Sequence, residues 1–179
     1  MTRHEFAITA IGRDRPGIVA AVSRALLELE GNIEDSQMSI LRGHFAVMLI
    51  VGVPAAVGAD QVARRLGGVR DELGLEAIMV EEVDELDPAP PRPTHVLTVY
   101  GADHPGIVSA VAGTLAAEGV NITDLETRLA GSDERPLYAM LLELALGDAD
   151  PDHLLERLRD VGEQETVEVS LRELDAEAL

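Results

Sequence analysis

Hydrophobic and polar positions along this chain follow two patterns in turn, the alternation of a strand and the spacing of a helix. The first half begins with a predicted strand followed by a predicted helix. Residues 5–11 alternate weakly and are rich in side chains that favour β-structure. After the turn at residues 12–17, four aliphatic side chains recur at helical spacing: Ile18, Val22, Leu26 and Leu29. We place Pro16 in the first turn of this predicted helix and Gly31 at its C-terminal cap.

The period then changes to two, which predicts a second strand over residues 32–41. Met38 and Ile40 share one face of it and three polar side chains share the other, so we expect one buried face and one wet face. Residues 45–53 are apolar enough for a central strand. A second amphipathic helix follows, and residues 77–83 complete the first half as a strand. The apolar side chains of that helix are Val62, Leu66, Val69 and Leu73.

The second half repeats this order of elements. Strands are predicted over 95–100, 121–129, 137–146 and 167–174, and helices over segments containing Ile107, Val111 and Leu115, and Leu154, Leu158 and Val161. The one large difference is a longer turn at 130–136. The order βαββαβ in each half predicts an α+β protein made of two ferredoxin-like domains, each an antiparallel sheet with both helices on one face.

The repetition extends to individual residues. Residues 8–19 return as residues 97–108, and the same offset carries Asn32 and Ile33 onto Asn121 and Ile122. A repeat of this length indicates a duplicated globular module. We predict a first domain over 1–86, a proline-rich linker over 87–93 and a second domain over 94–179. Because domains this small bury a low fraction of their surface, we expect the copies to pack on each other.

Composition excludes several classes of function. The chain has 33 acidic and 14 basic side chains, for a net charge of -19, and only two Phe, two Tyr and no Trp. It lacks both the basic surface and the aromatic platforms that bind nucleic acids, so we expect no direct nucleic-acid binding. Cysteine is absent, which removes thiol chemistry. With no signal-peptide pattern and no apolar run long enough to span a bilayer, we expect a cytoplasmic protein without membrane contact.

The repeated segment Asp-x-Pro-Gly lies where a strand leads into a helix, and in both copies an Asn follows the Asp by eighteen residues. One explanation is structural, since Asp can accept hydrogen bonds from the free amides of a helix start. The other is a binding site. Helix N-terminal amides attract a carboxylate, and Gly17 or Gly106 lets it approach the backbone. Asp and Asn side chains suit an ammonium group, so the motif favours a zwitterion.

With these motifs the chain resembles tandem ACT domain proteins over nearly its whole length. The resemblance implies that the loop after the first strand and the start of the second strand bind a small amino acid between paired domains. It also implies crossed sites, with Asp14 opposite Asn121 and Asp103 opposite Asn32. Serine-binding members carry a His where this chain has Gly12 and Gly101, so serine is not implied as the ligand. The candidate ligand-binding residues are Asp14, Arg15, Pro16, Gly17, Ile18, Asn32, Ile33, Asp103, His104, Pro105, Gly106, Ile107, Asn121 and Ile122.

Enzymatic function is not indicated, because the sequence has no nucleophile elbow, P-loop or dinucleotide fingerprint. The five histidines stand in no metal-binding pair, so we expect no metal and no cofactor. The resemblance implies a regulator that acts through a protein partner, in transcriptional control of amino-acid metabolism and of glycine in particular. The alternative is a ligand-free module for protein interaction. The ligand, the partner and homodimer formation are left open.

Overall fold

The computed structural model of this chain describes residues 3–83, 90–132 and 135–174. The chain divides into two compact units, Met1–Asp87 (unit 1) and Pro88–Leu179 (unit 2). Residues 87–89 of the predicted linker lie outside the described residues, and residues 90–93 belong to neither helix nor strand.

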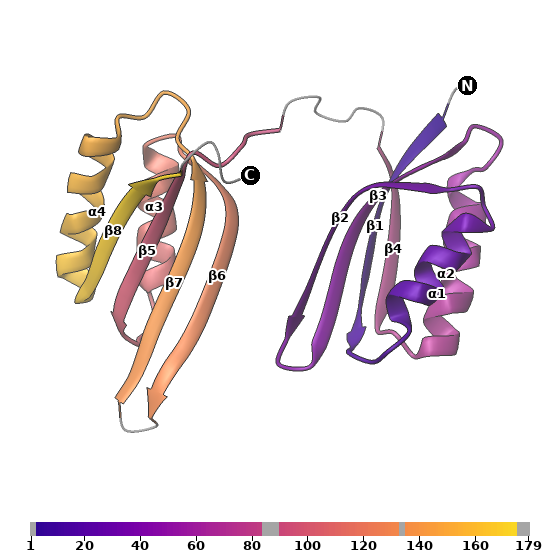
Figure 1. Cartoon of the computed structure of the whole chain (residues 1–179), viewed down its shortest axis with the longest axis horizontal. Coiled ribbons are helices and arrows are strands. Elements are labelled where there is room, and N and C mark those ends of the chain that lie inside the picture. Colours follow the sequence, from indigo (N-terminus) through magenta and orange to yellow (C-terminus); the bar gives the residue numbers. More distant parts are fainter. Residues whose placement is uncertain (1–2, 84–89, 133–134, 175–179) are drawn as a thin grey trace. The chain divides into compact units, whose positions relative to one another are not determined.

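Unit 1 has the predicted order of elements (Figure 1). The observed bounds are β1 (Arg3–Arg13), α1 (Ile18–Leu27), β2 (Asn32–Leu41), β3 (His44–Pro54), α2 (Ala59–Leu73) and β4 (Ala77–Val83). Unit 2 repeats it with β5 (His95–Ala102), α3 (Ile107–Ala117), β6 (Asn121–Ser132), β7 (Arg135–Ala145), α4 (Pro151–Glu165) and β8 (Val167–Glu173).

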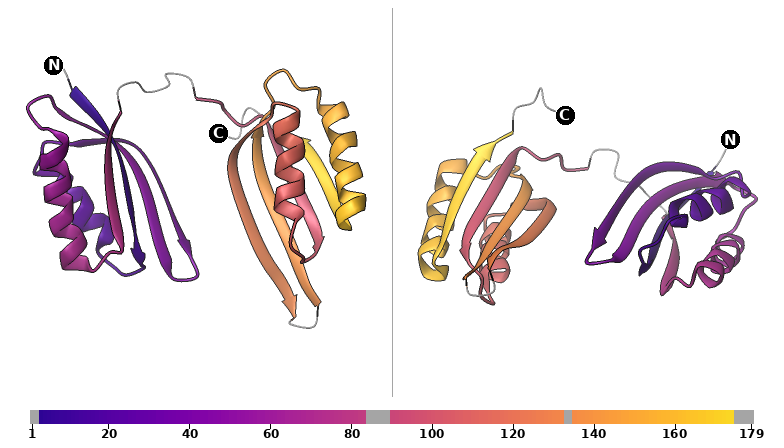
Figure 2. Two further views of the ribbon diagram at one scale, coloured as in Figure 1. Left: turned by 180° about the vertical axis from the view of Figure 1, so that it is seen from behind. Right: turned by 60° about the horizontal axis from the view of Figure 1, so that its bottom comes forward.

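Each unit is one antiparallel sheet with both of its helices on the same face (Figure 2). The strand orders are β2-β3-β1-β4 and β6-β7-β5-β8. Alternate side chains of the central strands point toward the helices, as the period of two requires. In β1, Phe6, Ile8 and Ala10 are fully buried on that face, and α2 contributes Val62 and Leu66, also fully buried. The prediction of two ferredoxin-like domains is therefore confirmed.

The cores of the two units are separate and almost entirely aliphatic. In unit 2 the buried side chains of β5 and β7 pack against those of α3 and α4. These include Leu97, Val99, Leu142, Leu144, Ile107, Val111, Leu115, Leu154 and Leu158. Burial of apolar area at about 25 cal/mol per Å² is the main force that holds each unit together. Within the described residues, no helix has the length and apolar character needed to cross a membrane.

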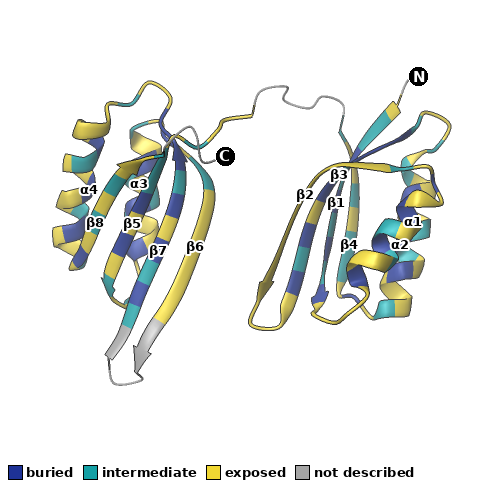
Figure 3. Ribbon diagram, viewed as in Figure 1, coloured by how far each residue is buried: buried dark blue, intermediate teal, exposed yellow. Residues whose placement is uncertain are grey.

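The expectation of a buried face on the second strand is wrong. Met38 and Ile40 do point to the helical side of the sheet, since they pair with the buried Val47 and Phe45 of β3. Each is nevertheless 49% exposed, because β2 is the edge strand and α1 and α2 do not reach over it (Figure 3). The edge strand β6 of unit 2 likewise leaves Leu125 and Leu129 exposed.

Two further expectations need correction. The turn predicted at 130–136 is mostly strand, because Ala130 pairs with Leu137 and Ser132 pairs with Arg135. The cross-strand hydrogen bonds gained by extending an antiparallel ladder outweigh the turn preference of these residues. Gly31 is not the left-handed residue at the end of α1, since Glu30 takes that conformation with φ 55°. Gly31 is needed for space instead, because a Cβ there would lie 3.0 Å from the Leu26 carbonyl oxygen.

Candidate functional site

Each predicted binding loop joins the first strand of a unit to its first helix and ends at a glycine with left-handed backbone. Gly17 (φ 100°) is the N-cap of α1, and Gly106 (φ 115°) is the N-cap of α3. Only glycine takes such φ values at little cost, so the motif requires it in both copies. The helices start after these glycines, and Pro16 therefore precedes the cap. The prediction that Pro16 lies in the first helical turn is wrong, because proline cannot supply the left-handed residue that begins this helix.

The first-turn amides of α1 and α3 lack a side-chain cap within the part of the chain that the structure describes. No side chain among the described residues caps α1 or α3, so Asp14 and Asp103 do not have the capping role considered from the sequence. Helix α4 shows the contrast, because the Asp150 carboxylate accepts hydrogen bonds from the amides of Asp152 and His153 at 2.9 and 3.0 Å. Free N–H groups and the positive end of the helix dipole make both starts suitable for an external anion.

The first loop forms a shallow cavity of roughly 480 Å³. The Asp14 amide donates to the Gly43 carbonyl at 2.9 Å, which ties the loop to the turn between β2 and β3. All five predicted residues of this loop line the cavity, and aliphatic and aromatic side chains of β2, β3 and α1 form the rest of its wall. The lining residues are Asp14, Arg15, Pro16, Gly17, Ile18, Val19, Ala20, Met38 and Phe45.

The second loop forms a cavity of roughly 470 Å³. Tyr138 stands here where unit 1 has Phe45, since each pairs with the equivalent glycine of the first strand. Burial, and then the negative charge of Asp103, raise the pKa of the Tyr138 phenol, which therefore stays neutral near pH 7. The lining residues are Asp103, His104, Pro105, Gly106, Ile107, Val108, Ser109 and Tyr138.

His104 makes contacts that connect the second loop to the end of α4. Its Nε2 lies 2.6 Å from the carbonyl oxygen of Glu165, and its Nδ1 lies 3.1 Å from the carbonyl oxygen of Pro105. Nδ1 is also 3.7 Å from the Glu165 carboxylate. The carbonyl of Glu165 and then that of Pro105 raise the pKa of His104 above its ordinary value of 6.5, and the charges of Glu165 and Asp103 add to this shift. Sequence reasoning missed Glu165, because it lies 61 residues from His104 and belongs to no motif.

Neither unit brings its own Asn to its own loop. Asn32 pairs with Gly52 near one end of β3, whereas the first loop begins beside His44 at the other end. At about 3.3 Å per residue these ends are roughly 26 Å apart, several times the length of an amino acid. In unit 2, Asn121 pairs with Ala145 and is equally far along β7 from the second loop.

The Asn positions have surroundings of their own. Asn32 and Ile33 border a hollow of roughly 530 Å³ beside the C-terminal half of α1. Ile33 is 38% exposed there, whereas Ile122 is partly buried against the core of unit 2. A single small ligand therefore cannot touch the loop and the Asn of one and the same unit.

Gly12 and Gly101, where serine-binding members have His, are needed for close packing. A Cβ on Gly12 would lie 2.9 Å from the Leu75 Cδ2 atom, and a Cβ on Gly101 would lie 2.9 Å from the Thr166 carbonyl oxygen. Contacts this short leave no room for a larger side chain without a shift of the neighbouring chain. The connection from the second helix to the last strand therefore occupies the space that such a His would need.

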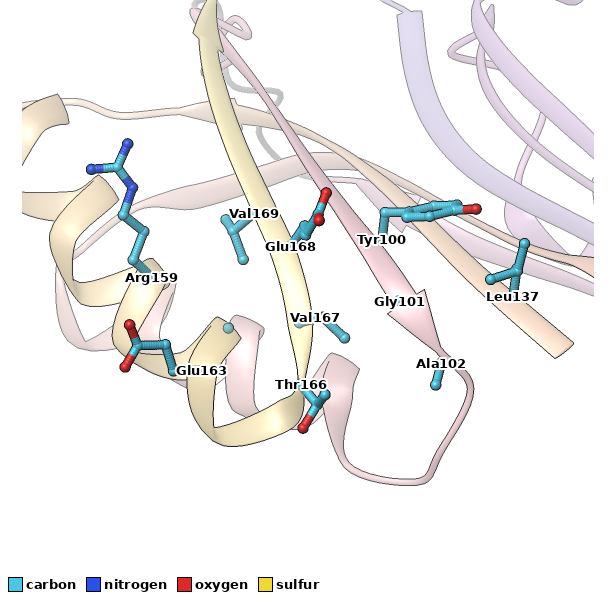
Figure 4. A pocket seen from close by; sticks show the side chains of 11 residues that line it. Tyr100, Gly101, Ala102, Leu137, Arg159, Glu163, Thr166, Val167, Glu168 and Val169 are labelled. Atoms are coloured by element: carbon cyan, nitrogen blue, oxygen red, sulfur yellow. The ribbon is translucent and has the colours of Figure 1, made fainter. Parts of the chain in front are cut away.

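The largest cavity described, roughly 820 Å³, lies elsewhere in unit 2, along the edge strand β8 (Figure 4). Arg159 and Glu163 of α4 stand on one side of β8, and Tyr100 of β5 stands beyond its other side. Tyr100 lies in the repeated segment 97–108, but Arg159 and Glu163 belong to no motif, so no pattern in the sequence predicted this hollow.

Comparisons with known proteins match the architecture in both halves. Residues 4–80 match one family model described as an ACT domain, and residues 95–163 match another of the same description. The glycine cleavage system transcriptional repressor of Escherichia coli is 32% identical over 129 residues, which cover 71% of this chain and 66% of the repressor. This chain thus spans just under two thirds of that relative.

Two other similar proteins are matched over different shares of their own length. A phosphoserine phosphatase of Mycobacterium tuberculosis is 27% identical over 172 residues, which are 93% of this chain and 40% of the phosphatase. The crystal structure of an unknown protein from Galdieria sulphuraria superposes with a TM-score of 0.79 and 29% identity, over 97% of this chain and 100% of that one.

Proposed function

Because this chain belongs to the ACT domain family, with one such domain in each half, we propose that it is a non-enzymatic regulator that binds a small amino acid. It acts through contact with a protein partner. The two ligand sites lie where a loop of one ACT domain meets the second strand of another, so that Asp14 acts with Asn121 and Asp103 acts with Asn32.

This proposal rests on the starts of α1 and α3, which follow Gly17 and Gly106. No side chain among the described residues caps either start. Such a start binds a carboxylate through its amides and its dipole. The Asp carboxylate of the loop attracts an ammonium group, and an Asn from another domain hydrogen-bonds to it. A small amino acid carries both groups on one carbon, and the apolar wall at Phe45 suits its remaining hydrogens or methyl group.

The regulatory role follows from the relative that is named a transcriptional repressor. The net charge of -19 repels the phosphate backbone, so control of transcription runs through another protein and not through contact with DNA. We assign the controlled process to glycine breakdown on the basis of that relative's name alone.

An enzymatic role has less support. The phosphoserine phosphatase matches this chain over only 40% of its own length, and the sequence carries no motif of a catalytic nucleophile or of phosphate binding. The shared segment is compatible with a regulatory part of that enzyme.

Titration calorimetry with glycine, L-alanine and L-serine tests the binding proposal. Asn32→Ala and Asn121→Ala should each weaken binding about 10- to 150-fold, since a hydrogen bond to a charged group contributes about 1.5–3 kcal/mol. Gln37→Ala is the matched control, because Gln37 is an exposed polar residue of the same strand β2 as Asn32 and lines neither loop cavity. Unchanged affinity in both Asn variants would contradict the crossed sites.

One observation favours a second candidate, a ligand-free interaction module. The edge of unit 1 carries exposed apolar side chains on β2 and α1, among them Met38, Ile40 and Leu27. A ligand that binds the native state raises the melting temperature by mass action. If none of the three amino acids raises it at millimolar concentration, this second candidate replaces the first.

A further inference from the structure

The two loops share one motif, but a different helix end lies next to each of them. In unit 2 the last residue of α4 is Glu165, and its main chain and side chain both reach the second loop. In unit 1 the last residue of α2 is Leu73, which packs partly buried against the core. The loop position of His104 is held in unit 1 by Arg15, which has a guanidinium in place of the imidazole ring.

The geometry of His104 suits its protonated form. Both ring nitrogens face carbonyl oxygens, those of Glu165 at 2.6 Å and Pro105 at 3.1 Å. A neutral imidazole has one N–H and can donate to one of them, whereas an imidazolium donates to both. Protonation therefore lets the ring donate at once to the Glu165 carbonyl on α4 and to the Pro105 carbonyl in the loop.

The Glu165 carboxylate lies where an external carboxylate would approach the loop. One of its oxygens is 3.6 Å from the position that a Cβ on Gly106 would take, and it is the nearest atom there. It also lies 3.7 Å from Nδ1 of His104. A negative group at this place repels a second carboxylate and attracts a protonated His104.

We propose that His104 and Glu165 form a latch that closes the second loop to an amino-acid carboxylate, while the first loop stays open because no described atom lies within 4 Å of a Cβ on Gly17. The ligand-binding part of this inference rests on the proposed function, whereas the latch itself does not. The two sites are therefore filled in order, the first at lower ligand concentration and the second after the latch opens.

The latch is pH-dependent, and the sign follows from the groups around the imidazole. Glu165 of α4 and Asp103 of the loop are the charged groups that act on His104, and Tyr138 of β7 is neutral near pH 7. Because folding raises the pKa of His104, its protonated contacts are fully present below pH 6.5 and are lost as pH rises through the raised value. The second loop is thus latched in mild acid and released in mild base.

Amide hydrogen exchange on the whole chain tests the latch without any ligand. Protection factors of the amides of His104, Gly106 and Ile107 should be higher at pH 6 than at pH 8 in the wild type and equal at the two pH values in His104→Gln. The equivalent amides of Arg15, Gly17 and Ile18 should show no such difference. Equal protection at both pH values in the wild type overturns the latch.

Glycine, added in a titration followed by the amide signals of Gly17 and Gly106, tests closure of the second loop. At pH 6, glycine should bind at Gly17 about tenfold more tightly than at Gly106, and Glu165→Gln should remove most of that difference, since it removes one close negative charge. Glu163→Gln, an exposed carboxylate on the same helix, is the matched control and should change neither site. Equal affinities at the two glycines in the wild type at pH 6 overturn closure. Binding at neither glycine overturns the proposed function, and the protection factors then decide the latch separately.

Discussion

The two units carry the same backbone at the loop but different side chains around it. Gly17 and Gly106 have nearly the same left-handed φ, and both helices behind them lack a side-chain cap. The neighbours of the loops differ, with Arg15 and Leu73 in unit 1 where unit 2 has His104 and Glu165. Duplication has thus kept the backbone that defines the site and changed the residues that control access to it. Leu73 and Glu165 come from helices remote in sequence, so the motif reveals the change from Arg15 to His104 but not the partner of His104.

The largest expected effect is the loss of stability when a buried leucine of either core is shortened. This loss should be similar in the two units. Leu66 of α2 and Leu158 of α4 hold the same place in their helices, and both are fully buried. Leu66→Ala and Leu158→Ala should each lower the free energy of unfolding of their own unit by about 2–5 kcal/mol, through lost burial and a cavity. Urea denaturation measures this. A loss below about 1 kcal/mol in one unit only would show that its core is loosely packed.

Alanine substitution at a closely packed glycine should destabilise the two units by different amounts. At both positions an added Cβ meets a side-chain end first, Val167 Cγ1 at 2.7 Å from Gly101 and Leu75 Cδ2 at 2.9 Å from Gly12. The nearest backbone atom is closer at Gly101, where the Thr166 carbonyl oxygen lies at 2.9 Å, than at Gly12, where the Leu75 Cα lies at 3.1 Å. Gly101→Ala should therefore cost about 1–3 kcal/mol of unfolding free energy, and Gly12→Ala less, because backbone yields less easily than a side chain.

Thermal denaturation of the two glycine variants gives the comparison. Gly113→Ala is the control, since nothing lies within 4 Å of its added Cβ and it sits in helix α3. There alanine should stabilise by about 0.5–1 kcal/mol, the usual difference between these residues in a helix. Equal losses of unfolding free energy in Gly12→Ala and Gly101→Ala would refute the argument that the closer backbone at Gly101 makes its substitution more costly.

The smallest effect is expected at the ion pairs that connect the two helices of each unit. Arg65 contacts Glu28 with Nη2 at 2.6 Å from the carboxylate, and in unit 2 Arg157 contacts Glu118 at 3.5 Å. Exposed pairs contribute about 0.2–1 kcal/mol. Arg65→Ala should fall within this range and Arg157→Ala toward its lower end, and both losses should shrink in high salt. Melting curves at low and high salt measure them, and a larger loss for Arg157→Ala would contradict the distances.

The elements were predictable because the periodic patterns persist over whole strands and helices. Strands 32–41 and 77–83 were predicted with their observed bounds, and α2 is continuous through Gly67 and Gly68 because its apolar side chains bury one complete face. The exposure of β2 was not predictable, because a period of two shows which side chains share a face and not whether a helix covers that face.

The strand-to-helix loops themselves were predictable, since a glycine before a helix is visible in the sequence. Five predicted residues of the first loop line one cavity. What the sequence could not give is the contact of His104 with Glu165, which depends on where α4 ends in space. The joint use of a loop and an Asn from another domain stays a prediction.

The replacement of Phe45 by Tyr138 at equivalent places in the two cores is part of a wider division of the aromatic side chains. Both phenylalanines, Phe6 and Phe45, belong to unit 1, both tyrosines, Tyr100 and Tyr138, belong to unit 2, and tryptophan is absent. Tyrosine emission and the tyrosine bands of near-ultraviolet circular dichroism therefore report on one half of the molecule without any label. The melting temperature measured from the tyrosine signal can be compared with the one measured from far-ultraviolet circular dichroism. Any difference between the two temperatures measures how independently the halves unfold.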